Sequence, residues 1–544
     1  MFFFGFFSYL CSSFFADNKI NIMKLKKILL TAGLAAFSCS SLIAGENNDY
    51  TILVSNRVKE SAEWMKAVDA LQKAHPQAEI LFYENHPEEA LQQLKVLQPR
   101  YVAVVETPEA IGRDFVIKLN QVSRKVDNDI YEDFMCGIIT GYNAEAAVRM
   151  VTDAQTPFEM KNAIATIQDL GHGKWFDSYA YLIDQRPGGY YVTRPKGEEA
   201  VEHQATDSIA NNHYLKLWNR AVEQWGDSAK YHFPESFSVM KPNTLQAFYD
   251  IYSTYDADVI FTASHATERN LEMPYSTGNI LCKDGKLFAD FPENPQYLRE
   301  TGERKVYLPI GNCLIGNVNN TANSMACAWM NSGNASTMVG YVVPTWYGRN
   351  GWGGLRTLVT QSGRYTVSES FYLNRQDLLY RLQENAPDVI DKDFPYDDQS
   401  NMEKEYEEAV KICGREISFD DLGQWYDRDV VAYYGDPAWE ARLQELKNEQ
   451  DVKVQMKVKG NKCIITIKTS KNFSAERMAG GNLPKENLQA QPFMYLLKER
   501  IKNPRLANGQ TWKAAVDENF LFLYDTNFEP NSTYKVELDC DGLL

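Results

Sequence analysis

Basic residues are outnumbered by acidic residues in this chain. Of its 544 residues, 56 are Lys or Arg and 72 are Asp or Glu, which gives a formal net charge of -16. Nucleic-acid-binding proteins need a basic face that neutralises phosphates, so we expect no nucleic-acid partner. The hydrophobic share of 44% and the charged share of 24% are typical of a globular protein.

Metal-binding motifs and disulfide frameworks are also absent from the sequence. The seven histidines include no HExxH pair and no clustered ligand spacing, so we expect no catalytic metal. The nine cysteines include no CxxC pair, and their scattered spacing resembles no disulfide scaffold. Because the number of cysteines after the N-terminal segment is odd, at least one thiol stays free or pairs between chains. These are Cys136, Cys282, Cys313, Cys327, Cys413, Cys463 and Cys540.

Long hydrophobic runs are missing, apart from a short one near the N-terminus. Three lysines precede an apolar stretch at 28–37 and small residues follow it, as in a secretory signal peptide that begins at Met23. We therefore assign 1–44 to an upstream segment with a signal peptide and predict export, to the periplasm, the cell surface or the medium. Lipid attachment at Cys39 is the alternative. No segment is long and apolar enough to span a membrane stably.

An alternation of apolar strands and amphipathic helices follows the signal peptide. This alternation predicts right-handed βαβ units and a parallel sheet. We assign 45–165 to an N-terminal α/β subdomain, with strands at 50–54, 79–83, 101–105 and 134–139 and helices at 60–73, 87–97, 111–123 and 144–151.

Two strands of a second α/β segment, 166–445, end at residues that can carry chemistry. The apolar run 258–264 leads directly into His265, and the run 306–312 leads directly into Cys313. Such short β-prone runs are typical of buried parallel strands, and functional groups gather at the carboxyl ends of these strands. Around them we expect a helix at 245–252, a helix at 322–330 and a strand at 337–343.

The hydrophobic period changes to two after residue 450. Apolar residues alternate with polar ones from Val452 to Val458, and a second strand returns after Gly460 and Asn461, which predicts a β-hairpin. We assign 450–544 to a C-terminal β-rich domain, with further strands at 520–523 and 534–538 and a helix near 492–501.

A cysteine and a histidine at neighbouring strand ends predict nucleophilic catalysis. An imidazole near Cys313 stabilises its thiolate and can later protonate a leaving amine. Backbone N–H groups next to His265 and at Cys313 can hold the oxyanion of a tetrahedral intermediate. The alternative is that Cys313 is a buried small hydrophobic residue, which is the commonest role of cysteine.

These residues resemble the caspase-like cysteine peptidases, and their surroundings look most like the gingipain branch. The resemblance covers roughly residues 50 to 540, and its specific motifs are the two strand ends; the blocks that match in order are 100–106, 131–141, the His265 and Cys313 strands, and 434–437. It implies an α/β fold with a caspase-like parallel sheet flanked by helices in two subdomains, followed by an immunoglobulin-like β-domain.

The resemblance also implies roles for individual residues. Cys313 would be the nucleophile, His265 the general acid/base, and Ala266 and Cys313 the backbone oxyanion donors. The family usually has glycine after the histidine, where this chain has Ala266, and a β-carbon there restricts the backbone. No cofactor is required for the chemistry, although the resemblance allows a structural calcium ion.

A glycine-rich aromatic loop at 344–354 is a candidate wall of the substrate pocket. Loops at the carboxyl edge of a sheet build such pockets, and the family resemblance implies a pocket tryptophan here. Trp346 is our first choice, with Tyr347 and Trp352 beside it, and packing of the loop onto the body is the alternative. Glu268, three residues after His265, is a further candidate that can orient the histidine, meet substrate or simply be solvated.

A second histidine, His172, lies between two glycines and is a possible competitor of His265. It follows residues 160–170, which we interpret as a helix, and lies 141 residues before Cys313 (313 − 172). We therefore interpret 171–173 as the turn that ends this helix.

The sequence as a whole predicts an exported cysteine endopeptidase that hydrolyses peptide bonds in protein or peptide substrates. Its first alternative is a catalytically inactive homologue with the caspase fold, retained as a surface binding or scaffold protein; Ala266 is the residue that favours it. A second alternative is a carbohydrate-active protein that stacks sugars on the aromatic loop.

Overall fold

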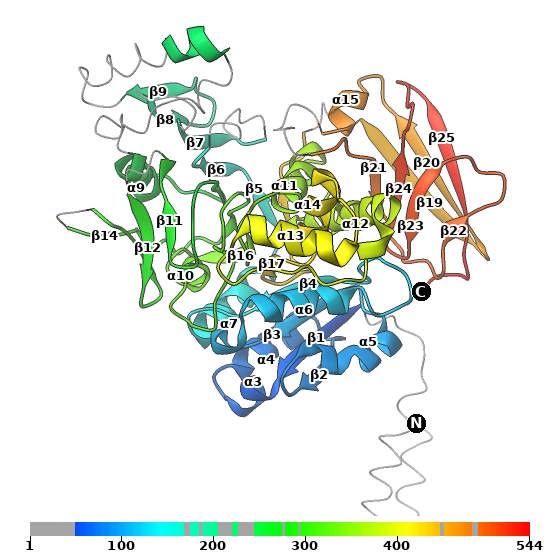
Figure 1. Cartoon of the computed structure of the whole chain (residues 1–544), viewed down its shortest axis with the longest axis horizontal. Helices are drawn as coiled ribbons and strands as arrows, with labels where there is room; N and C mark the ends of the chain where they lie inside the picture. The colour runs from blue at the N-terminus through cyan, green and yellow to red at the C-terminus, as the bar shows by residue number, and fades with distance from the viewer. Residues whose placement is uncertain are drawn as a thin grey trace, which may run out of the picture. The chain divides into compact units, whose positions relative to one another are not determined.

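A 12-stranded sheet dominates the computed structural model of the chain (Figure 1). Its strand order is β2-β1-β3-β4-β17-β16-β15-β10-β6-β7-β8-β9. The structure describes residues 49–167, 175–183, 189–204, 220–226, 244–274, 278–291, 294–446, 451–480 and 488–544. The expected signal peptide and the turn at 171–173 lie outside the described residues.

The N-terminal half of this sheet is parallel, as expected. β1 (Tyr50–Ser55) pairs with β2 (Glu79–Tyr83) and β3 (Tyr101–Val105), and β3 pairs with β4 (Met135–Ile139). Every residue of β1 and β4 is buried, because helices cover the sheet. The helical connections are α3 (Asn56–Glu60), α4 (Met65–Ala74), η2 (Pro87–Ala90), α5 (Leu91–Leu97), η3 (Pro108–Ala110), α6 (Arg113–Ser123) and α7 (Ala144–Asp153).

The second half of the sheet is also mostly parallel but runs in the opposite direction. β17 (Val431–Tyr434) joins the halves, because it is parallel to β4 and antiparallel to β16. Five strands are mutually parallel: β16 (Ala335–Tyr341), β15 (Lys305–Leu308), β10 (Val259–Phe261), β6 (Asn162–Ala165) and β7 (Ser178–Leu182). The antiparallel strands β8 (Gly189–Arg194) and β9 (Val201–Gln204) complete the sheet.

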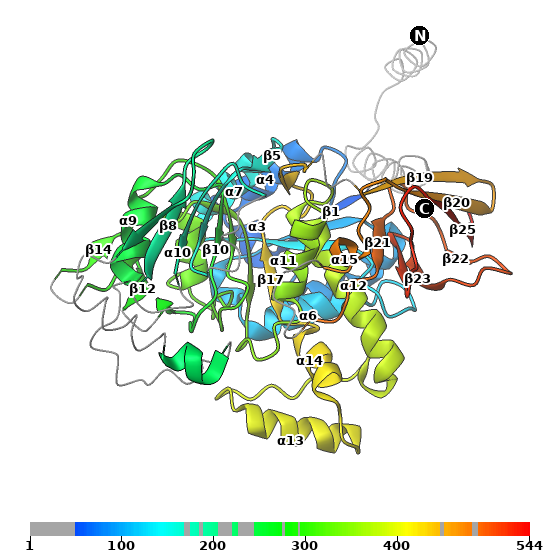
Figure 2. The ribbon, with the colours of Figure 1, turned by 90° about the horizontal axis from the view of Figure 1, so that it is seen from above.

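Four helices of the second half, α10, α12, α13 and α14, begin at side-chain caps. Ser324 caps α10 by accepting a hydrogen bond from the Cys327 N–H, and Thr366 and Glu369 form a capping box at α12. The helical elements are α9 (Thr244–Thr254), α10 (Met325–Asn331), α11 (Gly351–Thr360), α12 (Val367–Asn385), η8 (Pro387–Val389), α13 (Met402–Cys413) and α14 (Phe419–Asp427). Figure 2 shows α13 as the outermost helix of the group α11–α14.

Between His265 and Cys313 the chain forms a separate antiparallel sheet. Its central turn, Asp284-Gly285, has positive φ at both residues (50° and 71°), as a tight hairpin requires. The strands are β11 (Asn270–Glu272), β12 (Asn279–Lys283), β13 (Lys286–Ala289) and β14 (Gln296–Tyr297). A small parallel pair, β5 (Phe158–Met160) and β18 (Ala441–Leu443), lies elsewhere in the fold.

The C-terminal residues form two antiparallel sheets, drawn in orange and red in Figure 1. The predicted hairpin is confirmed as β19 (Val452–Lys459) and β20 (Lys462–Thr469). β25 (Thr533–Asp539) and β22 (Arg505–Leu506) complete the first sheet, and the second contains β21 (Phe493–Leu496), β24 (Phe520–Tyr524) and β23 (Lys513–Asp517). A short helix, α15 (Ala475–Met478), follows β20. The immunoglobulin-like topology and the domain boundaries stay predictions.

Several expected helices are wrong or shorter than predicted. The segment 160–170 contains the end of β5 and strand β6 in place of a helix, because the backbone of β6 pairs with that of β10. The segment near 492–501 contains β21, which pairs with β24. The predicted helix at 60–73 is broken by a turn between α3 and α4, and Trp352 lies in the first turn of α11 and not in a loop.

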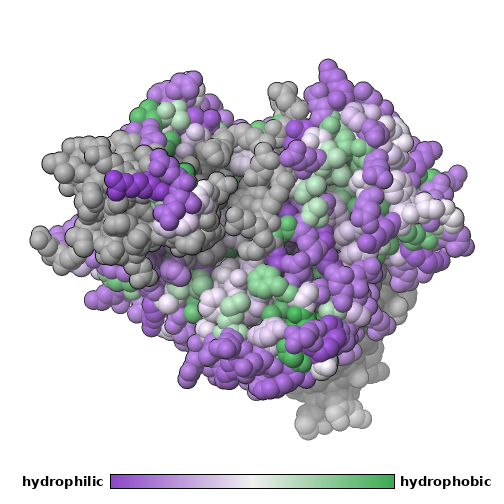
Figure 3. All heavy atoms as spheres, turned by 45° about the horizontal axis from the view of Figure 1, so that its top comes forward, coloured by the Kyte–Doolittle hydropathy of each residue, from purple (hydrophilic) through white to green (hydrophobic). Residues whose placement is uncertain are grey.

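One face of the molecule is mostly polar where its residues are described. Figure 3 shows a face on which hydrophilic side chains predominate and hydrophobic ones form small patches. Among the described residues, no helix combines the length and the apolar composition needed to cross a membrane.

Candidate active site

The strands that precede His265 and Cys313 are neighbours in the sheet. β10 and β15 are parallel and in register, with Val259 opposite Val306 and Phe261 opposite Leu308. Beyond the paired residues the two chains stay close, because a Cβ built on Gly311 would lie 2.8 Å from the Cβ of Ala263. Both segments therefore leave the sheet side by side at one edge, as the two strand ends predicted.

The side chain of Asn312 joins these two segments. Its Nδ2 donates to the Ser264 carbonyl oxygen at 2.8 Å and to the Ser264 hydroxyl at 3.2 Å. Its Oδ1 accepts from the Thr262 hydroxyl at 2.5 Å, and that hydroxyl lies 3.0 Å from the hydroxyl of Tyr307. Asn312 and Thr262 are completely buried. One fully satisfied amide thus ties the residue before Cys313 to the residue before His265.

Cys313 is half-buried, and its sulfur has a defined hydrogen-bond donor. The backbone N–H of Thr345 lies 3.2 Å from Sγ. The next residue, Leu314, has a φ of 58°, a left-handed conformation that costs a non-glycine residue about 1–2 kcal/mol. Its N–H donates to the Val343 carbonyl at 3.1 Å, which fixes this sharp turn at the end of β16. Strain of this kind gathers at functional sites.

His265 is exposed, and its ring makes no hydrogen bond within the described part of the chain. Its backbone is held in a tight hairpin, because the Glu272 N–H donates to the His265 carbonyl at 2.9 Å. Ala266 forms a bridge with Leu271 in the same hairpin.

Two backbone amides at the site have no acceptor. Within the described residues, neither the N–H of Ala266 nor that of Cys313 donates to another protein group. Ala266 does not have a positive φ, so its β-carbon causes no backbone strain at the position where the gingipain-like peptidases have glycine. Both donors are available to a ligand oxygen.

Five other thiols are disfavoured as nucleophiles by their surroundings. Burial raises the pKa of Cys327 to about 12 and that of Cys282 and Cys463 to about 11. The pKa values of Cys136 and Cys413 are raised as well, mainly by burial. These thiols stay protonated at neutral pH. Cys327 lies on α10 and is completely buried.

A polar cavity of about 500 Å³ lies next to the chain segments that carry Cys313 and Thr345, although neither Cys313 nor His265 is among its lining residues. Leu314 and Pro344 line it, and these residues flank Cys313 and the Thr345 donor in sequence. Five carboxylates line the cavity: Asp114, Glu268, Asp397, Asp398 and Glu405. Arg113 is the lining residue that pairs with two of them, at 2.6 Å from Asp398 and 3.5 Å from Asp114. The cavity therefore carries an excess of negative charge.

The buried carboxylate of this cavity comes from α13, far from Cys313 in sequence. Glu405 accepts hydrogen bonds from the Trp346 indole at 3.2 Å and from the Asp397 N–H at 3.0 Å. It is only 3% exposed, and burial raises its pKa. Within the described residues no cation pairs with it. Trp346 is not among the lining residues, but its indole N–H contacts the lining residue Glu405.

The other predicted pocket residues lie in three different environments. Glu268 lines the cavity and accepts a hydrogen bond from the Asn319 amide at 3.3 Å, but it makes none with His265. Tyr347 is buried among Phe419 and Tyr426, with ring centroids about 5 Å apart, and does not line the cavity. Trp352 is half-buried and packs against two backbone positions, Gly311 and Gly348.

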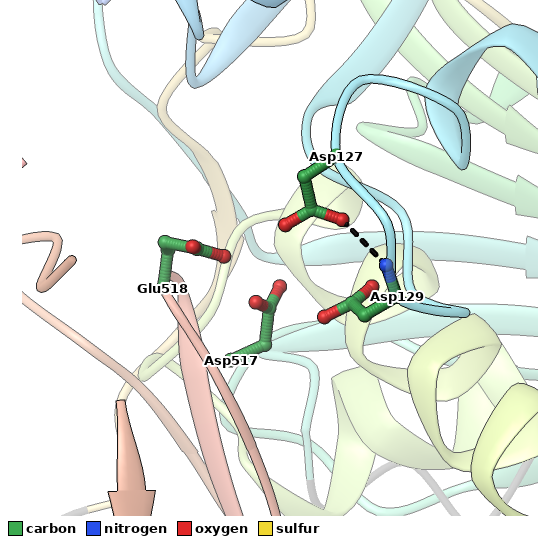
Figure 4. A group of neighbouring side chains, drawn as sticks. All are labelled: Asp127, Asp129, Asp517 and Glu518. Carbon is green, nitrogen blue, oxygen red and sulfur yellow. Dashed lines mark hydrogen bonds between the residues drawn. The ribbon is translucent and has the colours of Figure 1, made fainter. Parts of the chain in front are cut away.

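A second group of carboxylates lies away from the cysteine. Oxygens of Asp127, Asp129, Asp517 and Glu518 lie within 4.8 Å of one another (Figure 4). Burial and the neighbouring carboxylates raise the pKa of Asp129 to about 7 and raise that of Asp517 further. Asp517 is 3% exposed, and its side chain hydrogen-bonds with the carboxyl groups of Glu518 and Asp129. Sequence reasoning missed this group, because its members are almost 400 residues apart.

Comparisons with known proteins found remote structural similarity alone. No family model and no curated protein matches the chain. One similar structure is described as a protease; the match covers 78% of this chain and 85% of that chain, at 9% sequence identity and a TM-score of 0.36. A second is the Arg-specific cysteine proteinase gingipain R (RgpB); the match covers 92% of this chain and 93% of that chain, at 9% identity and a TM-score of 0.33. A third is the complex of the Porphyromonas gingivalis RgpB pro- and mature domains; the match covers 91% of this chain and 93% of that chain, at 8% identity and a TM-score of 0.32.

Proposed function

We propose that this chain is an exported cysteine endopeptidase with Cys313 as nucleophile and His265 as general acid/base. The observation that carries the proposal is the Asn312 bridge between the parallel ends of β10 and β15, which holds the two functional segments together. The thiol of Cys313 is also half-exposed and carries a backbone donor on its sulfur. These are the features that a thiolate nucleophile needs.

The reaction follows from the groups available at the site. The Cys313 thiol gives its proton to the His265 imidazole, and the thiolate forms a C–S bond with the peptide carbonyl carbon. The carbonyl oxygen becomes an oxyanion, which the free amides of Ala266 and Cys313 bind. The C–N bond then breaks, and the imidazolium of His265 protonates the leaving amine. Water attacks the thioester, gives a proton to His265 and releases the carboxylate product and the thiol.

The carboxylate-lined cavity supports a preference for a cationic side chain next to the scissile bond. Glu405 is buried at the cavity wall with neutral donors alone, so a bound ammonium or guanidinium group would compensate its charge. Glu268 adds a second carboxylate without a cationic partner in the described residues. Arginine and lysine are the residues with this charge.

The test is cleavage of a diverse fluorogenic peptide library in reducing buffer by the wild type, Cys313→Ala and His265→Ala. The proposal predicts cleavage by the wild type alone, with the fastest substrates carrying Arg or Lys before the cleaved bond. If the wild type cleaves no peptide and its Cys313 thiol is unreactive, the result would favour the inactive binding or scaffold protein.

The second carboxylate group supports a structural calcium ion. Ca²⁺ takes six to eight oxygen ligands, and Asp127, Asp129, Asp517 and Glu518 offer four carboxylates in one place. The buried Asp517 carboxyl lies among the other three, where burial and their mutual repulsion raise its pKa (Figure 4). An ion there would join the loop before β4 to the β23–β24 turn and would take no part in peptide hydrolysis.

A further inference from the structure

A second cavity, of about 420 Å³, lies where the first residues of β3, the start of α12 and the end of β21 meet. Its lining differs from that of the carboxylate-lined cavity, because it is rich in cations and tyrosines. The lining residues that matter here are Arg100, Arg364, Lys498, Tyr101 and Tyr495.

Three of the four cations that line this cavity have no anionic partner among the described residues, whereas Arg442 pairs with Glu369 and Glu440. Within the described residues, Arg100, Arg364 and Lys498 form no ion pair. Glu369 is the carboxylate among the lining residues, and it already pairs with Arg442 at 3.1 Å. Because the whole chain carries a net charge of -16, three unpaired cations around one cavity form a local reversal of charge. Such a concentration of positive charge attracts an anion.

Two residues that line the cavity carry buried hydrogen-bond donors without acceptors. The Nε of Arg100 and the hydroxyl of Tyr495 are buried and have no hydrogen-bond partner. The two residues are 9% and 6% exposed. The guanidinium is fixed in place, because its Nη2 donates to the Leu497 carbonyl at 3.0 Å. Burial raises the pKa of Tyr495 to about 12, so its hydroxyl keeps its proton at neutral pH. Unsatisfied buried donors are rare in native proteins and call for a partner.

We propose that this cavity binds an organic phosphate or sulfate ester. The oxygens of the ester group would accept from Arg100, Arg364 and Lys498, which are donors without acceptor capacity. The volume is typical of a small-molecule site and exceeds that of a bare oxyanion. Tyr101 and Leu496 offer apolar surface for the organic part. The site is independent of Cys313 and does not rest on the proposed peptidase activity.

Isothermal titration of the full chain with phenyl phosphate, phenyl sulfate and phenol tests this assignment. We expect one phenyl phosphate or phenyl sulfate per chain and no detectable binding of phenol, because the charged head supplies the specificity. The two affinities show whether the site prefers the phosphate or the sulfate group. If phenyl phosphate binds more tightly and its affinity falls between pH 7 and pH 5, the site binds the phosphate dianion, because the second pKa of a phosphate ester is about 6.

Lys498→Glu is the matched variant, because this side chain is exposed and has no partner that folding requires. It should lower the affinity for the bound ester about tenfold or more. The control is Lys502→Glu, an exposed lysine four residues later that does not line the cavity. Absence of binding by both esters, equal affinity of phenol, or equal affinities of the wild type and Lys498→Glu would overturn the proposal.

Discussion

The Nδ2 of Asn312 lies 2.8 Å from the carbonyl oxygen of Ser264, and this bond joins the segments that carry Cys313 and His265. Each of the two bonded residues directly precedes one of the proposed catalytic residues. Backbone hydrogen bonds between the two segments extend as far as the Thr262 N–H, which donates to the Leu308 carbonyl at 3.2 Å. The side chain of Asn312 therefore extends the alignment of the two chains up to the site.

Asn312→Ala should lower kcat more than it raises KM. The variant leaves the Thr262 hydroxyl and the Ser264 carbonyl without their partner, so the two segments lose alignment and kcat falls about 10–100-fold. The free energy of unfolding should fall by about 1–3 kcal/mol. Steady-state kinetics and urea denaturation measure the two effects.

Asn331→Ala is the control for this prediction, since it removes a similar amide-to-carbonyl bond, to Gly285 at 2.8 Å, in another part of the fold. It should reduce stability and leave kcat near the wild-type value. If both variants lose kcat equally, Asn312 has no special role in aligning the site.

Cys313 should react first with iodoacetamide at pH 7. The Cys313 sulfur is only half-buried and accepts a hydrogen bond from the Thr345 N–H, whereas burial raises the pKa values of Cys136, Cys282, Cys327, Cys413 and Cys463. Peptide mapping by mass spectrometry after partial labelling reports the order of modification. Faster labelling of any of those five thiols in the folded protein would contradict this ranking.

Glu405→Gln should reduce cleavage after Arg or Lys at least about tenfold, because the substituted side chain keeps its shape and loses its charge. Cleavage after neutral residues should change little. Glu403→Gln provides the control, as it removes an exposed carboxylate of the same helix that does not line the cavity. A uniform loss of activity toward all substrates would show that Glu405 supports the fold and does not select the substrate.

Calcium should raise the melting temperature of the wild type relative to EDTA. Asp517→Asn should reduce this increase, because it removes a buried carboxylate from the proposed ion. In EDTA the same variant should melt higher than the wild type, since repulsion among the carboxylates is relieved. Asp69→Asn, at an exposed position away from the group, should respond to calcium like the wild type. Equal melting temperatures of the wild type in calcium and in EDTA would contradict the proposed structural calcium ion.

Lys305→Met should stabilise the protein at pH 7 and lose this advantage by about pH 10. Burial lowers the pKa of Lys305 to about 8, below the value near 10.4 of an unfolded lysine. The unfolded state therefore holds the proton more tightly, and the lysine costs stability at pH values below about 8. The gain at pH 7 is about 1–3 kcal/mol, because the bond from Nζ to the Glu303 carbonyl is also lost. Lys502→Met, at an exposed lysine, should show no pH-dependent difference in thermal unfolding, and a constant gain for Lys305→Met at both pH values would contradict the argument.

The sequence predicted the sheet better than its surroundings. Local apolar runs were enough to find β1, β3, β10 and β15, because buried parallel strands consist of continuous β-prone residues. The same rule failed at 160–170, where β6 is too short to be told from a helix by periodicity. Parallel pairing of β10 with β15 followed from the two similar strand ends.

The parts of the site that depend on distant residues could not be predicted. Glu405 reaches the cavity from an outer helix, and its contact with Trp346 joins residues 59 positions apart. The bond of Asn312 to Ser264 joins residues 48 positions apart. No periodicity or motif in the sequence encodes such contacts. The role of Asn312 has one local signal, a polar residue at the buried end of an apolar strand.

The most direct test of the account is covalent trapping with a peptide that carries Arg or Lys next to an electrophilic chloromethyl ketone. Intact-mass and peptide mapping should show a single adduct, on Cys313, and its formation should slow markedly in His265→Ala while the protein stays folded. Absence of an adduct, or an adduct on another cysteine, would contradict the assignment of Cys313 as the nucleophile.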